Sequence, residues 1–159
     1  MFLSTVEKQL DAKRRIVVPH DFRAAATVAE AGGFGSVFCF PSIEADCLEG
    51  GGEVLFKQYL SLIEELPFGD PLRSALETTV LGGHTRMAFD AAGRITLPEA
   101  LCDQFGLTDW VAVVGMGDRF QIWSKESFDA RRNSERMVAR EGLAAYRNSQ
   151  RGLKAGGAA

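Results

Sequence analysis

Four charged residues, arranged as two pairs, are the first candidates for chemistry in this sequence. Asp11 lies four residues before Arg15, and Asp90 lies four residues before Arg94. An aspartate at the start of a tight turn accepts hydrogen bonds from the amides of that turn. It can also bond the arginine, which then loses less freedom when its guanidinium meets a phosphate or a base. Each pair therefore combines a turn-forming residue with a cation suited to polyanions.

The two pairs belong to two copies of one nine-residue segment, 11–19 and 90–98. Five positions are identical, namely the Asp, the following Ala, the Arg, the following Ile and the closing Pro. Similarity at a fixed offset, here 79 residues, indicates a duplicated structural unit. In each copy the sequence predicts a strand before the Asp, a turn, and a second strand returning after the Arg as a hairpin. The Pro ends that strand and begins a helix.

The doubled motif, Asp-x-x-x-Arg followed by three apolar or β-branched residues and Pro, closely resembles the MraZ family of bacterial DNA-binding regulators. The resemblance covers residues from Phe2 to about Phe128. It implies an α+β, mainly β fold, in which two tandem repeats of the AbrB and SpoVT kind form a pseudo-symmetric double-psi, swapped-hairpin barrel with peripheral helices. It also implies that Asp11 and Asp90 orient the motif, while Arg15 and Arg94 contact DNA.

The same resemblance implies a biological setting. Members of the family regulate the division and cell-wall gene cluster. We therefore expect a cytoplasmic, nucleoid-associated transcriptional regulator that binds direct repeats in double-stranded DNA upstream of its own operon. The expected assembly is a ring of about eight to twelve identical subunits, which would gain avidity by engaging several repeats at once.

Positive charge is concentrated at the two ends of the chain, although the net charge is −3. Residues 1–23 carry five Lys/Arg against three acids, residues 24–118 carry four against fourteen, and residues 119–159 carry nine against four. A local basic patch attracts phosphate even on an acidic protein, because salt screens charges that lie beyond roughly 8–10 Å.

The first motif turn is more basic than the second. Lys13 and Arg14 precede Arg15, and we expect all three to contact DNA. The second copy has Ala92 and Gly93 at the corresponding positions. Glycine suits a turn position that other residues adopt with difficulty. The first copy is therefore expected to contribute more of the charge.

The predicted organisation has five segments: repeat 1 over 1–52, a helical linker over 53–79, repeat 2 over 80–128, a basic C-terminal helix over 129–151, and a disordered Gly- and Ala-rich tail over 152–159. The linker has apolar residues at helical spacing from 53 to 66. In the MraZ family such helices lie outside the barrel and help to assemble subunits. The basic C-terminal segment is typical of a solvated helix face, and it could also assist DNA binding electrostatically.

Two stretches of the first repeat are harder to interpret. Residues 19–31 favour a helix that Gly32 and Gly33 end, and residues 34–40 favour a strand with both faces buried. The segment 48–52 aligns with the good strand 120–124, but its three glycines weaken any strand. They predict a degraded strand or a mobile loop. A phosphate-binding loop is disfavoured, because no Gly-Lys-Ser/Thr follows them.

Other function classes find little support in the sequence. No Cys-x-x-Cys or His-x3–5-His spacing indicates a metal site or a cofactor, and the cysteines and histidines are expected to be ordinary structural residues: Cys39, Cys47, Cys102, His20 and His84. No nucleophile occurs with a base and an orienting group in a recognisable pattern, so no enzyme is predicted. No apolar run could span a membrane. An antitoxin-like protein-binding module of the AbrB type is the alternative, although such proteins usually carry one repeat.

Overall fold

The computed structural model describes residues 1–26 and 35–157. Its strands are β1 (Thr5–Gln9), β2 (Arg15–Val17), β3 (Ser36–Pro41), β4 (Leu48–Gly51), β5 (Thr85–Ala88), β6 (Arg94–Thr96), β7 (Trp110–Gly115) and β8 (Phe120–Ser124). Its α-helices are α1 (His20–Ala26), α2 (Glu53–Glu65), α3 (Pro71–Leu76), α4 (Glu99–Phe105) and α5 (Lys125–Gly156), and a π-helical turn, η1 (Glu77–Leu81), follows α3.

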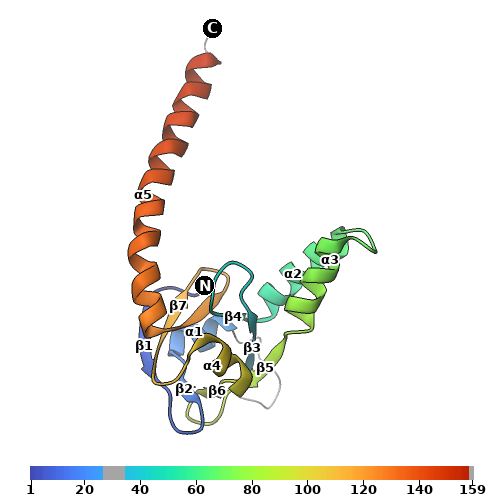
Figure 1. The fold of residues 1–159 in the computed structure, drawn as a ribbon, viewed down its shortest axis with the longest axis vertical. Coiled ribbons are helices and arrows are strands. Elements are labelled where there is room, and N and C mark those ends of the chain that lie inside the picture. Colours follow the sequence, from blue (N-terminus) through green and yellow to red (C-terminus); the bar gives the residue numbers. More distant parts are fainter. Residues whose placement is uncertain (27–34, 158–159) are drawn as a thin grey trace. The chain divides into compact units, whose positions relative to one another are not determined.

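Six strands form one antiparallel sheet in the order β1-β7-β8-β4-β3-β5, and β2 pairs with β6 in a separate two-stranded ribbon (Figure 1). The repeat makes β1 equivalent to β5, β2 to β6, α1 to α4, β3 to β7 and β4 to β8. If each strand is replaced by its equivalent from the other repeat, the result is the same strand order read from the opposite edge of the sheet. The strand order is therefore symmetric with respect to the two repeats, and the expected α+β class is confirmed.

The predicted pairing of each motif hairpin is wrong. The local turn is closed, since Asp11 N donates to Arg15 O and Arg14 N donates to Asp11 O. Beyond the turn, however, β1 pairs with β7 and β2 pairs with β6, so both strands find their partners in the other repeat. The cause is burial: a pair of strands this short buries too little apolar surface alone, and exchanging strands lets the repeats share one core.

The shared core is built from both halves of the chain. Phe2 and Phe22 of the first repeat pack around Phe120 of the second, with ring centroids 5.3 to 6.1 Å apart. Ile16 and Ile95, which pair across the ribbon, are both buried. Because each repeat completes the other's hydrophobic core, neither half is expected to be stable alone.

The glycine-rich segment forms a strand, which corrects the expectation of a degraded strand or mobile loop. β4 lies between β3 and β8 in the middle of the sheet and is buried throughout. A Cβ on Gly50 would lie 2.7 Å from Cζ of Phe120, and one on Gly52 would lie 2.6 Å from the carbonyl oxygen of Ala26. The glycines are therefore positions where neighbouring groups pack against bare backbone.

A buried carboxylate in β4 is held by hydrogen bonds and by an arginine. Glu49 is 1% exposed and accepts hydrogen bonds from Ser42 Oγ and Tyr59 OH, each at 2.9 Å. Its Oε1 lies 3.2 Å from Nε of Arg119. Burial, together with the nearby Glu49 charge, raises the pKa of the Tyr59 hydroxyl, which keeps it a donor. A buried charge needs such partners, so this network ties β4 to α2 and to the turn before β8.

The linker helices agree with the sequence. α2 covers almost all of the predicted 53–66 stretch, and the turn before α3 is closed by the Asp70 side chain, which accepts from Leu72 N at 2.8 Å. α1 is described as far as Ala26, and the rest of the predicted helix 19–31 lies outside the described part, which omits residues 27–34. The start of the predicted strand 34–40 falls there too, while the rest is β3.

The chain divides into two compact units, Met1–Lys125 and Glu126–Ala159. The second contains most of α5, which runs through Gly156 without a buried residue in its described length. The predicted disordered tail is therefore corrected over 152–156, which are helical. The composition there includes good helix formers, and two glycines do not stop a helix that is already formed. None of the helices described is long and apolar enough to cross a membrane.

Candidate nucleic-acid interface

The ribbon of β2 and β6 brings the two motif arginines to one surface. The register pairs Arg15 with Thr96 and Val17 with Arg94, so these four side chains share a face. The opposite face carries the buried pair described above. Val17 is 44% exposed, which leaves the outer face open to solvent. The arginines are diagonal neighbours, and in antiparallel pairs such Cα atoms lie roughly 7–8 Å apart.

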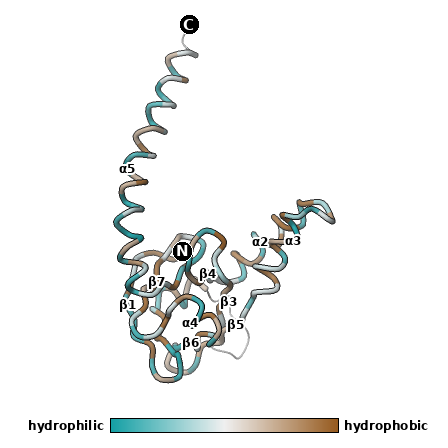
Figure 2. The backbone as a smooth tube through the Cα atoms, in the orientation of Figure 1, coloured by the Kyte–Doolittle hydropathy of each residue, from teal (hydrophilic) through white to brown (hydrophobic). Residues whose placement is uncertain are grey.

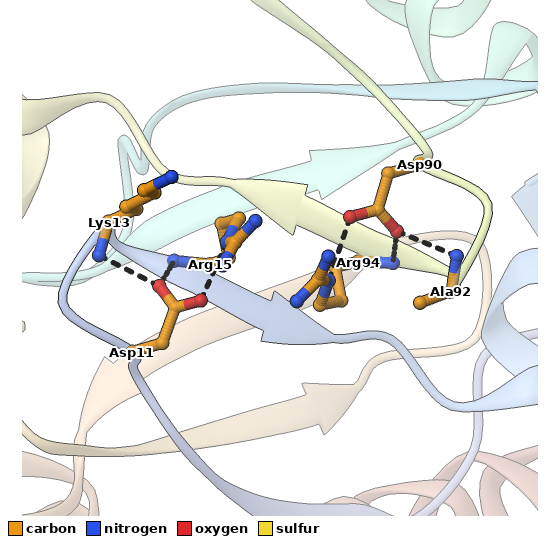
Figure 3. Close-up of polar contacts among 6 residues, drawn as sticks. All are labelled: Asp11, Lys13, Arg15, Asp90, Ala92 and Arg94. Carbon is orange, nitrogen blue, oxygen red and sulfur yellow. Dashed lines mark hydrogen bonds and ion pairs between the residues drawn. The ribbon is translucent and has the colours of Figure 1, made fainter.

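The first turn is held by the Asp11 carboxylate (Figure 3). Its Oδ1 accepts from the backbone amides of Lys13 at 2.9 Å and Arg15 at 2.8 Å. Its Oδ2 accepts from Nε of Arg15 at 2.6 Å. The aspartate thus forms the turn and also fixes the direction of the guanidinium. Because it engages Nε, it leaves the two terminal nitrogens of the guanidinium to other partners.

The second turn repeats this geometry almost atom for atom (Figure 3). Asp90 Oδ1 accepts from Ala92 N at 3.0 Å and Arg94 N at 2.8 Å, and its Oδ2 accepts from Arg94 Nε at 2.7 Å. In both turns the backbone amide of the arginine is the main reason why the pKa of the aspartate falls below its usual 3.8. Both carboxylates are therefore ionised at neutral pH.

A left-handed residue completes each turn. Arg14 has φ +59°, which is uncommon for a residue with a side chain, and Gly93 has φ +75° at the corresponding position. Each also continues the ribbon, since Leu97 N donates to Arg14 O at 2.8 Å and Val18 N donates to Gly93 O at 3.0 Å. Arg14 Nε donates to Leu97 O at 3.3 Å. Part of the Arg14 guanidinium is therefore used inside the protein.

A further arginine lies at the second turn, and sequence reasoning did not identify it. A Cβ on Gly93 would lie 2.6 Å from Nη1 and 2.7 Å from Cζ of Arg23, so the guanidinium of α1 covers the glycine. By the offset of the repeat, Arg23 corresponds to Cys102. Burial raises the pKa of the Cys102 thiol, and the positive charge of nearby Arg14 opposes that rise. The only signal in the sequence was that an arginine and a cysteine occupy equivalent positions in the two repeats.

The cysteines and histidines were the candidates for a metal site in the sequence. All three cysteines are buried and none forms a disulfide, and among the described residues no group of His, Cys, Asp or Glu has the arrangement of a metal site. Burial raises the pKa of Cys39 to about 12, so it remains a thiol. His84 stacks on Phe38, with ring centroids 5.0 Å apart. Lys13 is exposed at the first turn.

Comparison with known proteins identifies the family. A family model described as "MraZ protein, putative antitoxin-like" matches residues 1–78 and 80–141. The chain belongs to the MraZ family. This confirms the resemblance carried by the doubled motif, and the matched region contains the whole ribbon and both turns.

Named relatives in the MraZ family match most of the chain. A protein of Phenylobacterium zucineum is 68% identical over 97% of this chain and 94% of its own length. One from Caulobacter vibrioides (strain NA1000 / CB15N) is 67% identical over the full length of both chains. One from Hyphomonas neptunium is 36% identical over 87% of this chain and 81% of its own. All three are named "Transcriptional regulator MraZ".

Proposed function

We propose that this protein is a sequence-specific DNA-binding transcriptional regulator. The observation that carries the proposal is the pair of guanidinium groups, Arg15 and Arg94, held by carboxylates on the exposed face of a two-stranded ribbon. The major groove of B-DNA admits a two-stranded ribbon, and arginine is the commonest reader of guanine there. The names of the relatives support a regulatory role.

Each residue of the ribbon has a distinct part in this proposal. Arg15 and Arg94 contact base edges, while Asp11 and Asp90 orient them. Lys13 and Arg14 provide phosphate contacts at the first turn. Because the orienting bonds exist before DNA arrives, little side-chain freedom is lost on binding. The strand exchange between the repeats supports a closed, pseudo-symmetric double-psi, swapped-hairpin barrel as the scaffold.

The proposed setting follows the family. The protein would act in the cytoplasm on the nucleoid, binding direct repeats in double-stranded DNA upstream of its own operon in the division and cell-wall cluster. One ribbon offers few contacts, so a ring of about eight to twelve subunits would gain affinity from effective concentration on tandem sites. Sedimentation of the full chain with and without operator DNA tests this assembly.

Fluorescence anisotropy on the native upstream region and on a scrambled duplex tests the function. We expect Arg15→Ala and Arg94→Ala each to weaken binding to the native region about ten- to a hundredfold, because a bidentate guanine contact contributes about 1–3 kcal/mol. Lys57→Ala is the matched control. It removes a cation from α2 that is 69% exposed and pairs with Glu53.

The control should bind like the parent. Binding to the native region that both arginine variants retain would contradict base reading by the ribbon. A parent that shows no preference for native over scrambled DNA would contradict the regulator itself. In that case a pull-down for a protein partner would test the antitoxin-like alternative, which the description of the family model also mentions.

A further inference from the structure

Helix α5 carries five cations on one face. Successive residues of an α-helix are turned by about 100°, so positions 136, 140, 147, 151 and 154 fall within about 60° of one another. We call this set the basic stripe: Arg136, Arg140, Arg147, Arg151 and Lys154. All five are exposed. At about 1.5 Å per residue, the stripe is about 27 Å long.

The carboxylates of the same stretch lie off the basic stripe. Within residues 133–156 they are Glu135 and Glu141. Glu135 pairs with Arg131, with 2.6 Å between Oε1 and Nε. Glu141 is turned away from every member of the stripe by about 80° or more. The stripe therefore presents positive charge along its whole length without an acid among its members.

We infer that the basic stripe binds the phosphates of duplex DNA, as a second contact in addition to the base-reading ribbon. One strand of B-DNA has a phosphate every 3.4 Å or so along the axis, so about 27 Å matches roughly eight phosphates. Four of the five cations are arginines, whose planar fork suits phosphate oxygens. This inference rests on the proposed function, because it extends the same DNA complex.

Other occupants fit α5 less well. A helix that lies on a membrane needs a broad apolar face beside its charges. The large apolar residues are instead distributed around α5. Leu143, Tyr146 and Leu153 lie about 20°, 80° and 100° from Arg136 on one side of the stripe. Met137 lies about 40° beyond Arg151 on the other side, and Val138 lies on the opposite face. Figure 2 accordingly shows hydrophobic colour scattered along the helix. A solvated helix with one cationic side matches a polyanion best.

The basic stripe also extends past the part of the chain that the family model matches. That match ends at residue 141, whereas Arg147, Arg151 and Lys154 lie beyond it. The ribbon lies wholly inside the match. Base reading thus belongs to the matched region, and the stripe is an addition whose contribution can be removed separately.

The test compares three forms of the full chain by anisotropy on native and scrambled duplexes between about 50 and 200 mM salt, the range over which phosphate contacts change affinity strongly. The first is the parent. The second replaces all five stripe residues with Gln. The third keeps the net charge but moves two cations by about 100° around the helix, through four substitutions: Arg140→Glu, Glu141→Arg, Arg147→Asn and Asn148→Arg.

We expect the Gln variant to lose up to about 4.5 units of slope in log affinity against log salt on both duplexes, because each of the five phosphate contacts contributes about 0.9. Its affinity should fall at least tenfold at the lowest salt, while its preference for native DNA stays. The third form should lose part of the slope despite its unchanged charge. Circular dichroism should show intact helix in all three, since α5 has no buried residue in its described length.

Equal affinities and slopes for the parent and the Gln variant would overturn the stripe while leaving base reading by the ribbon untouched. Conversely, Arg15→Ala and Arg94→Ala should lose the preference for native DNA but keep the salt slope that the stripe contributes. That result would separate the ribbon from the stripe. If the parent lacks any native preference, stripe-dependent binding to scrambled DNA still supports the inference. Stripe-dependent binding to phosphatidylglycerol vesicles without binding to DNA would overturn it.

Discussion

The first motif turn carries Arg14 at its left-handed position, whereas the second carries Gly93 there. The difference is compensated by the helices that follow the motifs. Beside Arg14 the helix offers the small thiol of Cys102, and over Gly93 the other helix places the guanidinium of Arg23. Beside its motif arginine, each end of the ribbon therefore has one further guanidinium, supplied by the turn at one end and by a helix at the other.

The same exchange occurs where β4 meets β8. Leu48 is paired with Ile122, and Gly50 is paired with Phe120. By the pseudo-symmetry these pairs are equivalent, so one contact joins two side chains of medium size and the other joins a large ring to a glycine. The Phe120 ring fills the space that a Cβ at Gly50 would need. The large ring thus occupies space that the missing side chain of Gly50 leaves open, as close packing requires.

These two comparisons show how a duplicated unit can diverge without losing its fold. Strands and helices of one repeat pack on the other repeat. Once the two copies differ in sequence, equivalent positions therefore have different neighbours. A loss in one copy can then be balanced by a gain in the other, which makes the substituted pairs interdependent. The comparison is tested by changing one or both members of such a pair.

The largest effect is expected at Gly50. Gly50→Ala should lower the free energy of unfolding by about 1–3 kcal/mol, because the new methyl would overlap the Phe120 ring and the carbonyl oxygen of Phe38. Urea denaturation at one fixed protein concentration measures this. Gly142→Ala is the matched control, since no neighbouring atom lies within 4 Å of the added carbon.

Combining Gly50→Ala with Phe120→Leu should cost less than the sum of the two single changes, because the smaller side chain makes room for the methyl. The control in α5 should be neutral or gain up to about 1 kcal/mol from helix propensity. Strict additivity of the double variant would show that the volume exchange between β4 and β8 is not real.

An intermediate effect is expected at the turn. Cys102→Arg alone should destabilise the protein by about 1–3 kcal/mol, because it adds bulk and a second cation beside Arg14. Arg14→Gly alone should change stability little, since relief of the left-handed backbone offsets the lost bond to Leu97 O. The double variant reproduces the arrangement of Gly93 and Arg23. We expect it to recover about 1 kcal/mol or more relative to the sum, as measured by the same denaturation.

The smallest difference is expected between Asp11 and Asp90, whose bonds agree within 0.1 Å. Both have a lowered pKa in the folded state, so their stabilisation is complete above the ordinary value of 3.8 and disappears as the pH falls below it. Asp11→Asn and Asp90→Asn should therefore lower the denaturation midpoint equally at pH 7. Each should lose its difference from the parent in acid. Unequal losses at pH 7 would break the equivalence of the turns.

Local patterns in the sequence determined a large part of this protein. The repeat, the turns at Asp11 and Asp90, the left-handed site at Gly93 and the helix at 53–66 follow from short-range hydrogen bonds and periodicity, which neighbouring residues specify. The family could be recognised from the same nine residues. These features are local, so a single sequence reveals them.

The tertiary structure alone decided what each local element meets. The partners of β1 and β2, the buried strand at Gly50 and the guanidinium of Arg23 over Gly93 all involve residues far apart in the sequence. Glycine in a strand weakens it by local rules, yet here Phe120 requires it. Such choices depend on which surfaces can be buried together, and that is a property of the whole fold.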